Sequence, residues 1–333
     1  ELEQPTGLSL TADSYPRTSG STSAEPLGIW VACRLLGLEC AWQKSFNGNL
    51  LLPLTPGATE KLEPLHAGLM QPLWQRVRHK GTHSAYRALI EGQCDLIYEC
   101  RLPSEDEKKL MQARNVELDT SMIAWDAFVF LRHTDNPVQS LTLEQIRNIY
   151  THAPEEAQMA TGLITNWKTV GGPDKPIHAY VRNRNSGSQE TMKTLVMKER
   201  SMIRGRSMTG MTMAGPYNLM HNDPNGIGYT FFYYQTYMAP NRTKTFPLHA
   251  ESSKPKTKKS ENPPETSVNV LAVDGVLPTR KTMANRTYPL CTPVYAVIRK
   301  DTGPAEPAAR LRHWLLSPEG QRVVGETGYI PYK

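Results

Sequence analysis

The 333-residue sequence lacks the motifs of the common hydrolases and nucleotide-binding enzymes. It contains no G-x-S-x-G, no H-E-x-x-H and no P-loop. It also lacks a C-x-x-C pair, which is typical of many zinc and redox sites. No apolar run reaches the length of about 18 residues that a transmembrane helix needs. We therefore expect a chain that is not an enzyme, needs no cofactor or metal and contains no transmembrane helix.

The five cysteines give little support for a disulfide framework. Because five is an odd number, at least one thiol has no partner within the chain. Cys33 and Cys40 fall two turns apart on one predicted helix, which is too far for a disulfide if that helix is straight. His79 and His83 flank Gly81 and have no third ligand nearby, so we interpret them as a loop pair and not as a metal site.

The charge balance is close to even. The chain has 38 basic and 32 acidic residues, a formal net charge of +6, and most of the basic residues are scattered. This modest excess gives little support for a nucleic-acid partner, and we expect none. The one dense basic cluster, 254–259, falls in a polar, proline-rich stretch over 240–266 that we interpret as a surface loop or insertion.

Strand-like and helix-like segments alternate along the chain, which indicates an α/β fold. The strongest strand signal is the apolar run 127–131. Thr142 and Gln145 form a capping box that begins a helix ending near Tyr150. The other expected elements are helices over 27–35 and 84–91, strands over 94–99 and 294–298, an aromatic segment over 227–234, and two closing helices around 311–315 and after 317.

The segment 180–191 combines two arginines with a Ser-Gly-Ser loop that opens an amphipathic helix. Ser186 and Gln189 stand in capping-box spacing. A helix start carries unpaired N–H groups and partial positive charge, and Gly187 allows an anion to approach the backbone. With a nearby arginine as a bidentate donor, the pattern indicates a small oxyanion at a helix N-terminus. The alternative is an ordinary capped helix with solvated arginines.

Two other helix starts share this chemistry. Residues 19–23 and 81–84 are also rich in hydroxyl groups and contain glycine, and each precedes a predicted helix. We expect the three starts to converge on one anion. The alternative is that each loop is only a helix cap, since such loops are frequent caps.

Several further motifs follow one another in a specific order between residues 14 and 333. They are 141–150, 162–172, 182–188, 227–229, 271–276, 314–321 and 328–331. As an ordered set they resemble the PstS-like phosphate-binding proteins, which are the solute-binding subunits of phosphate ABC transporters. Each motif alone is weak evidence, and the specificity lies in the order.

The resemblance implies a type II periplasmic-binding-protein fold. Two α/β lobes, each a mixed sheet flanked by helices, are joined by two hinge strands around an anion cleft. Lobe I would hold residues 1–124 and 267–333, and lobe II residues 125–266. Compared with the family pattern, the chain carries insertions near 151–161 and 240–266, and the first is interpreted as surface elaboration or a partner contact.

The resemblance also implies which residues contact the ligand. The first loop would supply Thr22 and Ser23, the second Thr82, and the third Arg182, Ser186, Gly187 and Ser188. Where the family usually has an aspartate or two serines after a strand, this chain has Glu99 and Cys100. The aspartate accepts a hydrogen bond from protonated phosphate, which helps to reject sulfate. Glu99 and Cys100 are therefore further candidates, while Arg184 lies off the family's arginine position and is expected to be solvated.

The function that the resemblance implies is binding without catalysis. Inorganic phosphate or a similar oxyanion would be captured between the lobes and delivered to an ABC transporter permease. The protein would be a monomer outside the cytoplasmic membrane, either periplasmic or lipid-anchored, and the sequence opens at Glu1 without the leader that would decide between them. One alternative is a PstS-like module with an altered or lost ligand, acting in sensing or surface interaction. The other, an enzyme with phosphatase-like turnover, has little support in the motifs.

Overall fold

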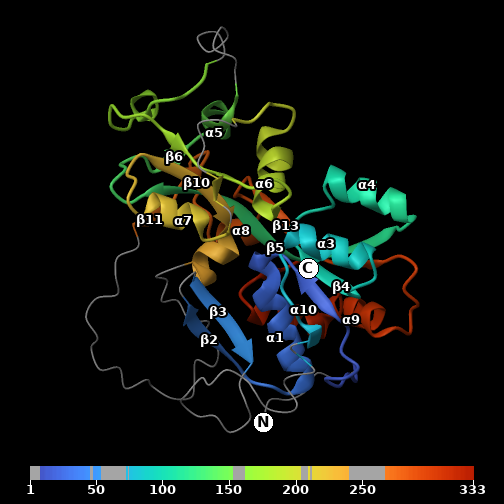
Figure 1. Ribbon diagram of the computed structural model, residues 1–333. Helices are drawn as coiled ribbons and strands as arrows, with labels where there is room; N and C mark the ends of the chain where they lie inside the picture. The colour runs from blue at the N-terminus through green and yellow to red at the C-terminus, as the bar shows by residue number, and fades with distance from the viewer. Residues whose placement is uncertain are drawn as a thin grey trace, which may run out of the picture.

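A computed structural model of the chain describes residues 8–45, 48–53, 73, 75–152, 162–203, 209–210, 212–239 and 267–333 (Figure 1). The predicted insertion over 240–266 lies outside the described residues. Of the insertion predicted over 151–161, the structure describes only residues 151 and 152. Among the described residues, no helix has the length and apolar character needed to cross a membrane.

The described elements alternate between strands and helices, as the sequence predicts. The strands are β1 (Thr18–Gly20), β2 (Cys40–Ser45), β3 (Gly48–Pro53), β4 (Leu96–Glu99), β5 (Leu118–His133), β6 (Ser140–Leu141), β7 (His178–Ala179), β8 (Val181–Arg182), β9 (Thr209–Gly210), β10 (Gly226–Phe231), β11 (Val268–Val270), β12 (Ala272–Val273), β13 (Cys291–Arg299) and β14 (Ile330–Pro331). The α-helices are α1 (Glu25–Leu36), α3 (Thr82–Ile90), α4 (Glu105–Arg114), α5 (Leu143–Tyr150), α6 (Gly187–Thr191), α7 (Gly215–Met220), α8 (Arg280–Ala284), α9 (Pro307–Leu315) and α10 (Pro318–Glu326). Short 3₁₀ turns are η1 (Thr22–Ala24) and η3 (Trp167–Val170), and π-helical turns are η4 (Met192–Met197) and η5 (Tyr234–Met238).

The main sheet is built around the 16-residue strand β5. Its strand order is β1-β4-β13-β5-β10-β7, and β11 and β14 also pair with β5. Residues 118–127 of β5 pair antiparallel with β13, whereas residues 128–132 pair antiparallel with β10. The strand therefore passes from one half of the molecule into the other, as Figure 1 shows.

These halves are the two lobes of the predicted fold class. Lobe I contains β1, β4, β13, β14 and the first part of β5, and lobe II contains β7, β10, β11 and the rest of β5. The predicted return to lobe I at residue 267 does not match this pairing. Because β11 pairs with residues 131–133 of β5 and β12 pairs with β6, residues 268–273 extend lobe II, and the chain re-enters the lobe I sheet only at β13.

Local sequence explains several element boundaries. The Thr142 hydroxyl accepts a hydrogen bond from the Gln145 N–H at 3.1 Å, and the Gln145 side chain accepts one from the Thr142 N–H at 2.8 Å. Helix α5 therefore begins where the capping box predicts. The Ser317 hydroxyl accepts from the Gly320 N–H at 3.1 Å and begins α10 in the same way. The apolar run 127–131 is fully buried within β5, as its composition predicts.

The expectation that Cys33 and Cys40 stay apart is wrong, because they form a disulfide. Helix α1 ends at Leu36, and Gly37 takes the left-handed conformation with φ of 68°. This glycine turn reverses the chain, so Cys40 opens β2 and does not continue the helix. The two Cα atoms lie 6.7 Å apart, within the range of disulfides.

Strands β2 and β3 form an antiparallel hairpin that the sequence analysis did not predict. It packs on α1 of lobe I and also reaches η5 of lobe II. The Asn49 side chain donates a hydrogen bond to the Tyr237 carbonyl at 3.1 Å. At Gly48, a Cβ would lie only 2.1 Å from the Met238 carbonyl oxygen, so glycine permits this close approach. The hairpin therefore contacts both lobes.

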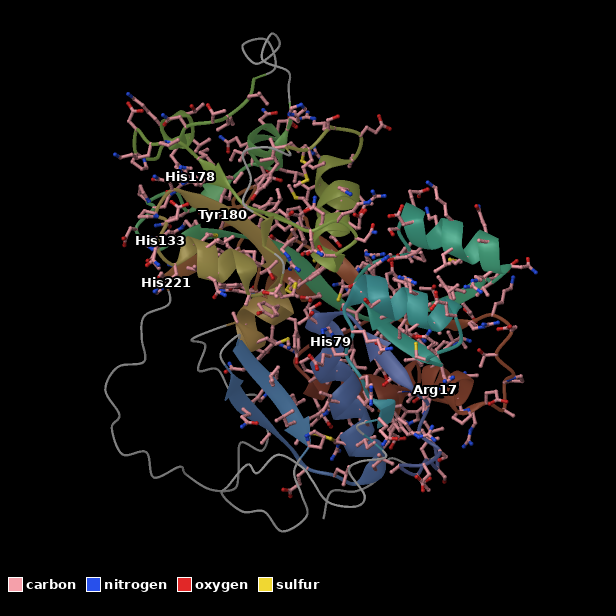
Figure 2. The ribbon with its side chains drawn as sticks, in the orientation of Figure 1. Arg17, His79, His133, His178, Tyr180 and His221 are labelled. Atoms are coloured by element: carbon pink, nitrogen blue, oxygen red, sulfur yellow. A yellow bond between two sulfur atoms is a disulfide. The ribbon has the colours of Figure 1, made fainter. Side chains whose placement is uncertain are left out.

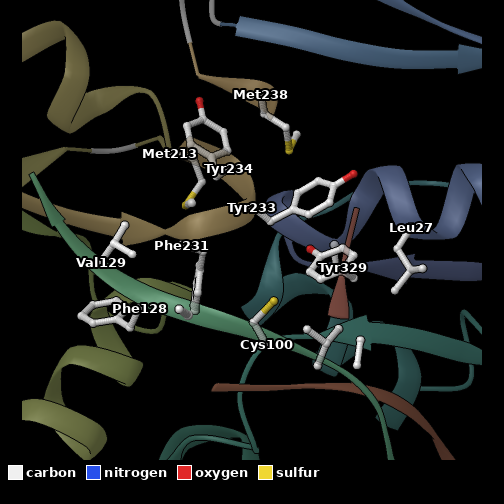
Figure 3. Close-up of a cluster of buried hydrophobic side chains, with 14 of the residues drawn as sticks. Leu27, Cys100, Phe128, Val129, Met213, Phe231, Tyr233, Tyr234, Met238 and Tyr329 are labelled. Atoms are coloured by element: carbon white, nitrogen blue, oxygen red, sulfur yellow. The ribbon is translucent and has the colours of Figure 1, made fainter. Parts of the chain in front are cut away.

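A buried cluster fills the junction between the lobes (Figure 3). The Tyr233 and Tyr329 rings stack with centroids 4.0 Å apart. The Tyr233 hydroxyl donates to the Thr327 carbonyl at 2.9 Å, and the Tyr329 hydroxyl donates to the Ser23 carbonyl at 2.5 Å. Since Ser23 belongs to the first hydroxyl-rich loop, the hydrogen bond from the buried Tyr329 fixes the position of that loop.

Candidate functional site

The three hydroxyl-rich helix starts converge in one cleft of about 510 Å³. Residues 21–23 reach it from η1, residues 81–84 from the start of α3, and residues 186–188 from the start of α6. Seven predicted ligand contacts line it: Thr22, Ser23, Thr82, Arg182, Ser186, Gly187 and Ser188. Three separate segments thus present their helix N-termini to the same space.

The charge of the cleft is positive. Lys80, Arg182 and Arg184 line it, and its described lining residues include no aspartate or glutamate. Helix starts add partial positive charge, because their first N–H groups have no preceding carbonyl to bind. The cleft therefore suits a small anion held by many donors.

Arg182 is the buried cation of the cleft, with only 7% of its surface exposed. Its Nη1 lies 3.4 Å from the Ser188 hydroxyl and 3.1 Å from the Met213 sulfur. The Arg182 N–H donates to the Gln189 side chain at 2.9 Å, which fixes the backbone beneath the helix start. Burial lowers the pKa of Arg182 to about 10, although the nearby Tyr229 opposes part of this shift. The guanidinium stays charged at neutral pH, and an anion beside it would offset its loss of hydration.

The start of α6 faces the start of α3 across the cleft. The Ser186 hydroxyl accepts a hydrogen bond from the Gln189 N–H at 3.3 Å and caps α6, as the spacing predicts. A Cβ on Gly187 would lie 2.9 Å from Thr82 Oγ1, closer than an ordinary contact. Glycine at this position therefore lets the second and third loops, which belong to different lobes, close on each other.

The first loop meets a histidine that the sequence analysis assigned only to a loop pair. Thr22 Oγ1 lies 3.0 Å from His79 Nε2, and His79 Nδ1 lies 3.1 Å from the Gly20 carbonyl oxygen. The other member of that pair, His83, contacts Glu107 through Nδ1 at 2.9 Å. The two rings therefore have different partners, and only His79 joins the first loop.

Glu99 and Cys100 do not line the cleft, unlike the other candidate residues. Glu99 is fully buried at the end of β4, and neither carboxyl oxygen has a hydrogen-bond partner of regular geometry among the described residues. Burial raises the pKa of Glu99 to about 8, although Arg101 and the Thr82 hydroxyl lower it. The Cys100 sulfur lies 3.2 Å from the Ser23 hydroxyl. Both side chains support the loops from the protein interior and do not face the ligand space.

Direct contacts between the lobes flank the cleft, and Arg184 takes part in them although its side chain stays largely exposed to solvent, as expected. Arg184 Nη2 donates to both carboxylate oxygens of Asp106 at 2.8 Å, and the Asn185 side chain donates to the same carboxylate at 2.9 Å. Arg101 Nη2 donates to the Asn185 carbonyl at 3.0 Å. Arg101 is itself fixed by two hydrogen bonds to Glu107, at 2.6 and 2.8 Å. The third loop is thus tied to α4 of lobe I.

Other residues of the cleft were missed from the sequence. They come from the β2–β3 hairpin, from the segment before α7, from the end of β10 and from η5: Asn49, Leu50, Thr212, Met213, Ala214, Phe231, Tyr234 and Met238. The apolar residues among them carry no local signal of a site, because the same residue types fill any core. The signal for His79 is its position three residues before Thr82, within reach of the same cleft.

Comparisons with known proteins match the sequence to one family and to proteins named as phosphate-binding proteins. The family model of the PBP superfamily domain matches residues 68–319. A phosphate-binding protein PstS of Borreliella burgdorferi is 22% identical over 250 residues, covering 73% of this chain and 76% of the relative. A phosphate-binding protein PstS of Pseudomonas aeruginosa is 26% identical over 270 residues, covering 77% and 73%.

Two solved structures share the fold. One is described as a phosphate ABC transporter substrate-binding protein of Clostridium perfringens with bound phosphate. It has a TM-score of 0.60 and 23% identity, and the match covers 95% of this chain and 98% of that one. The other is an ABC-type phosphate transport receptor of Vibrio cholerae, with a TM-score of 0.56 and 20% identity over 94% and 98% of the chains.

Proposed function

The chain belongs to the PBP superfamily, and we propose that it captures inorganic phosphate between its lobes for uptake by an ABC transporter. The observation that carries the proposal is the cleft, where three helix starts and the buried Arg182 meet and no acidic side chain is among the described lining residues. The relatives named above as phosphate-binding proteins support the choice of ligand. No step of this function requires catalysis.

The ligand contacts follow from the geometry of the cleft. Arg182 would pair with the oxyanion, and the N–H groups of Gly187 and Ser188 would donate from the first turn of α6. Thr82 lies opposite them at the start of α3. Closure of lobe II on lobe I would remove water from these hydrogen bonds and strengthen them.

The proposal includes a monomer that works outside the cytoplasmic membrane and passes its ligand to a membrane permease. The Cys33–Cys40 disulfide supports this location, because disulfides persist mainly in oxidising compartments. Fractionation of cells would distinguish the two locations, because a periplasmic protein is released in soluble form and a lipid-anchored protein stays with the membrane.

A thermal melt of ligand-free protein with phosphate or sulfate, at matched ionic strength and neutral pH, tests the function. Phosphate at about a hundred times its Kd should stabilise the native state by about 2.7 kcal/mol and raise the melting temperature. Arg182→Met keeps an apolar stem in the buried position but removes the charge, and should weaken phosphate binding by about 10- to 150-fold. The matched control is Arg87→Met, an arginine on the exposed face of α3.

The outcomes separate the candidate functions. Stabilisation by phosphate that Arg182→Met removes and Arg87→Met retains would support the proposal. If neither anion stabilises the wild-type protein, the alternative of a binding module with a changed or lost ligand replaces it. Equal stabilisation of wild type and Arg182→Met would show that the anion binds elsewhere.

A further inference from the structure

The hydrogen bonds of His79 fix the direction of the hydroxyl group of Thr22. The Gly20 carbonyl oxygen can only accept, so His79 Nδ1, at 3.1 Å, must carry the hydrogen. Burial lowers the pKa of His79, although the Gly20 carbonyl raises it, so the ring is neutral near pH 7. A neutral imidazole protonated at Nδ1 leaves Nε2 as an acceptor.

The single hydroxyl hydrogen of Thr22 is therefore directed at His79. Thr22 Oγ1 lies 3.0 Å from His79 Nε2, and the bond needs the threonine as donor because the nitrogen carries no hydrogen. A hydroxyl has one hydrogen and two lone pairs. Once the hydrogen is committed, Thr22 offers only lone pairs to the rest of the cleft.

Other hydroxyl groups and the side-chain amides of Asn183 and Asn185 also line the cleft, but a hydroxyl whose hydrogen is not committed can turn to donate, whereas Thr22 can only accept. Arg182, Lys80 and the helix-start N–H groups are donors that cannot accept, and the described lining residues include no carboxylate. Glu99, which the sequence suggested as the acceptor, is buried beneath the loops and does not line the cleft. His79, which lies 57 residues from Thr22 in the sequence, keeps the Thr22 hydroxyl as an acceptor at the cleft.

We propose that Thr22, held as an acceptor by His79, makes the site select an oxyanion that carries its own hydrogen. This inference rests on the proposed function and identifies the side chain that sets its specificity. Inorganic phosphate retains at least one hydrogen near pH 7 and can donate it to Thr22. Sulfate has none, so its oxygen would face the lone pairs of the half-buried Thr22 without a hydrogen between them, which leaves this acceptor unsatisfied once the ligand covers it.

The test is the ratio of phosphate to sulfate affinity, measured by calorimetry for wild type and three variants at pH 7.5. Thr22→Val keeps the shape and removes the acceptor. His79→Phe keeps a ring but frees the Thr22 hydrogen to donate to a ligand. The control is His178→Phe, whose ring pairs with Asp223 through Nδ1 at 2.9 Å and is well separated from His79 in Figure 2.

The ratio should fall at least about tenfold in both Thr22→Val and His79→Phe, the cost of one unsatisfied buried group. In His79→Phe the fall should come mainly from tighter sulfate binding, which loss of structure cannot produce. His178→Phe should keep the wild-type ratio. If both anions weaken equally in the two variants, or the ratio does not change, the inference is wrong while the proposed function stands. Wild type that binds neither anion would overturn both.

Discussion

The close approach of Gly187 to Thr82 gives the sharpest quantitative prediction, for the substitution Gly187→Ala. The new Cβ would lie 2.9 Å from Thr82 Oγ1, whereas ordinary contacts begin near 3.4 Å, an overlap of about half an ångström. Thr82 is β-branched and buried at the start of α3, so its hydroxyl has little freedom to move aside. Overpacking of this kind costs about 1–3 kcal/mol.

That cost arises only where the two lobes meet, because Gly187 belongs to lobe II and Thr82 to lobe I. We therefore expect Gly187→Ala to weaken phosphate affinity by about 5- to 150-fold, the equivalent of this energy. The melting temperature without ligand should stay unchanged or rise slightly, since alanine favours the helix that begins here. Calorimetry with phosphate and a melt of the ligand-free protein measure the two effects separately.

The control is Gly303→Ala, where the nearest atom to the new Cβ would be Glu306 Cγ at 3.7 Å. This variant should bind phosphate as wild type does. Wild-type affinity in Gly187→Ala would refute the reasoning, because it would mean that the loops do not approach so closely when ligand is bound. A large drop in the ligand-free melting temperature would instead place the strain within lobe II.

Three further predictions follow from contacts described above. Arg184→Ala removes the two hydrogen bonds from Arg184 Nη2 to the Asp106 carboxylate between the lobes, so stopped-flow measurements should show faster phosphate release. An unchanged rate would exclude a role in holding the lobes closed. Replacing Cys33 and Cys40 by serine should lower the free energy of unfolding by about 2 kcal/mol, the value expected for a disulfide that closes so short a loop. Urea titrations measure this change, and an unchanged free energy of unfolding would contradict a stabilising disulfide. Burial raises the pKa of Glu99 to about 8, so the native state holds a proton that the unfolded state releases above its ordinary pKa near 4.5. Native stability in urea should therefore fall between about pH 5 and 8, and Glu99→Gln should reduce this fall by up to about 5 kcal/mol; equal slopes would contradict the shift.

Features set by neighbouring residues could be predicted from the sequence. The capping box of Thr142 and Gln145 begins α5, and the cap at Ser186 begins α6, because each bond joins residues three apart. The three helix starts of the cleft were predicted because hydroxyl and glycine residues mark such starts wherever the chain goes next. The order of a wider set of motifs along the chain, of which 182–188 is one, carried the family resemblance.

Features set by distant residues could not be predicted. Arg184 and Asp106 are 78 residues apart, and nothing near Arg184 in the sequence shows that this exposed arginine also pairs between the lobes. The Cys33–Cys40 disulfide depends on one glycine turn, since a helix continuing past Leu36 would have kept the thiols apart. The role of His79 depends on Gly20 and Thr22, which the fold brings to it from another loop.

The passage of β5 through both sheets has a consequence for how the protein folds. Residues 118–127 complete the sheet of one lobe and residues 128–132 that of the other, so neither lobe has a sheet that is complete without this strand. An excised lobe would expose an unpaired strand edge, which favours aggregation. The two lobes are therefore not separable modules: we expect them to unfold in a single cooperative transition, and half-molecules to be recovered in soluble form only when both are produced together.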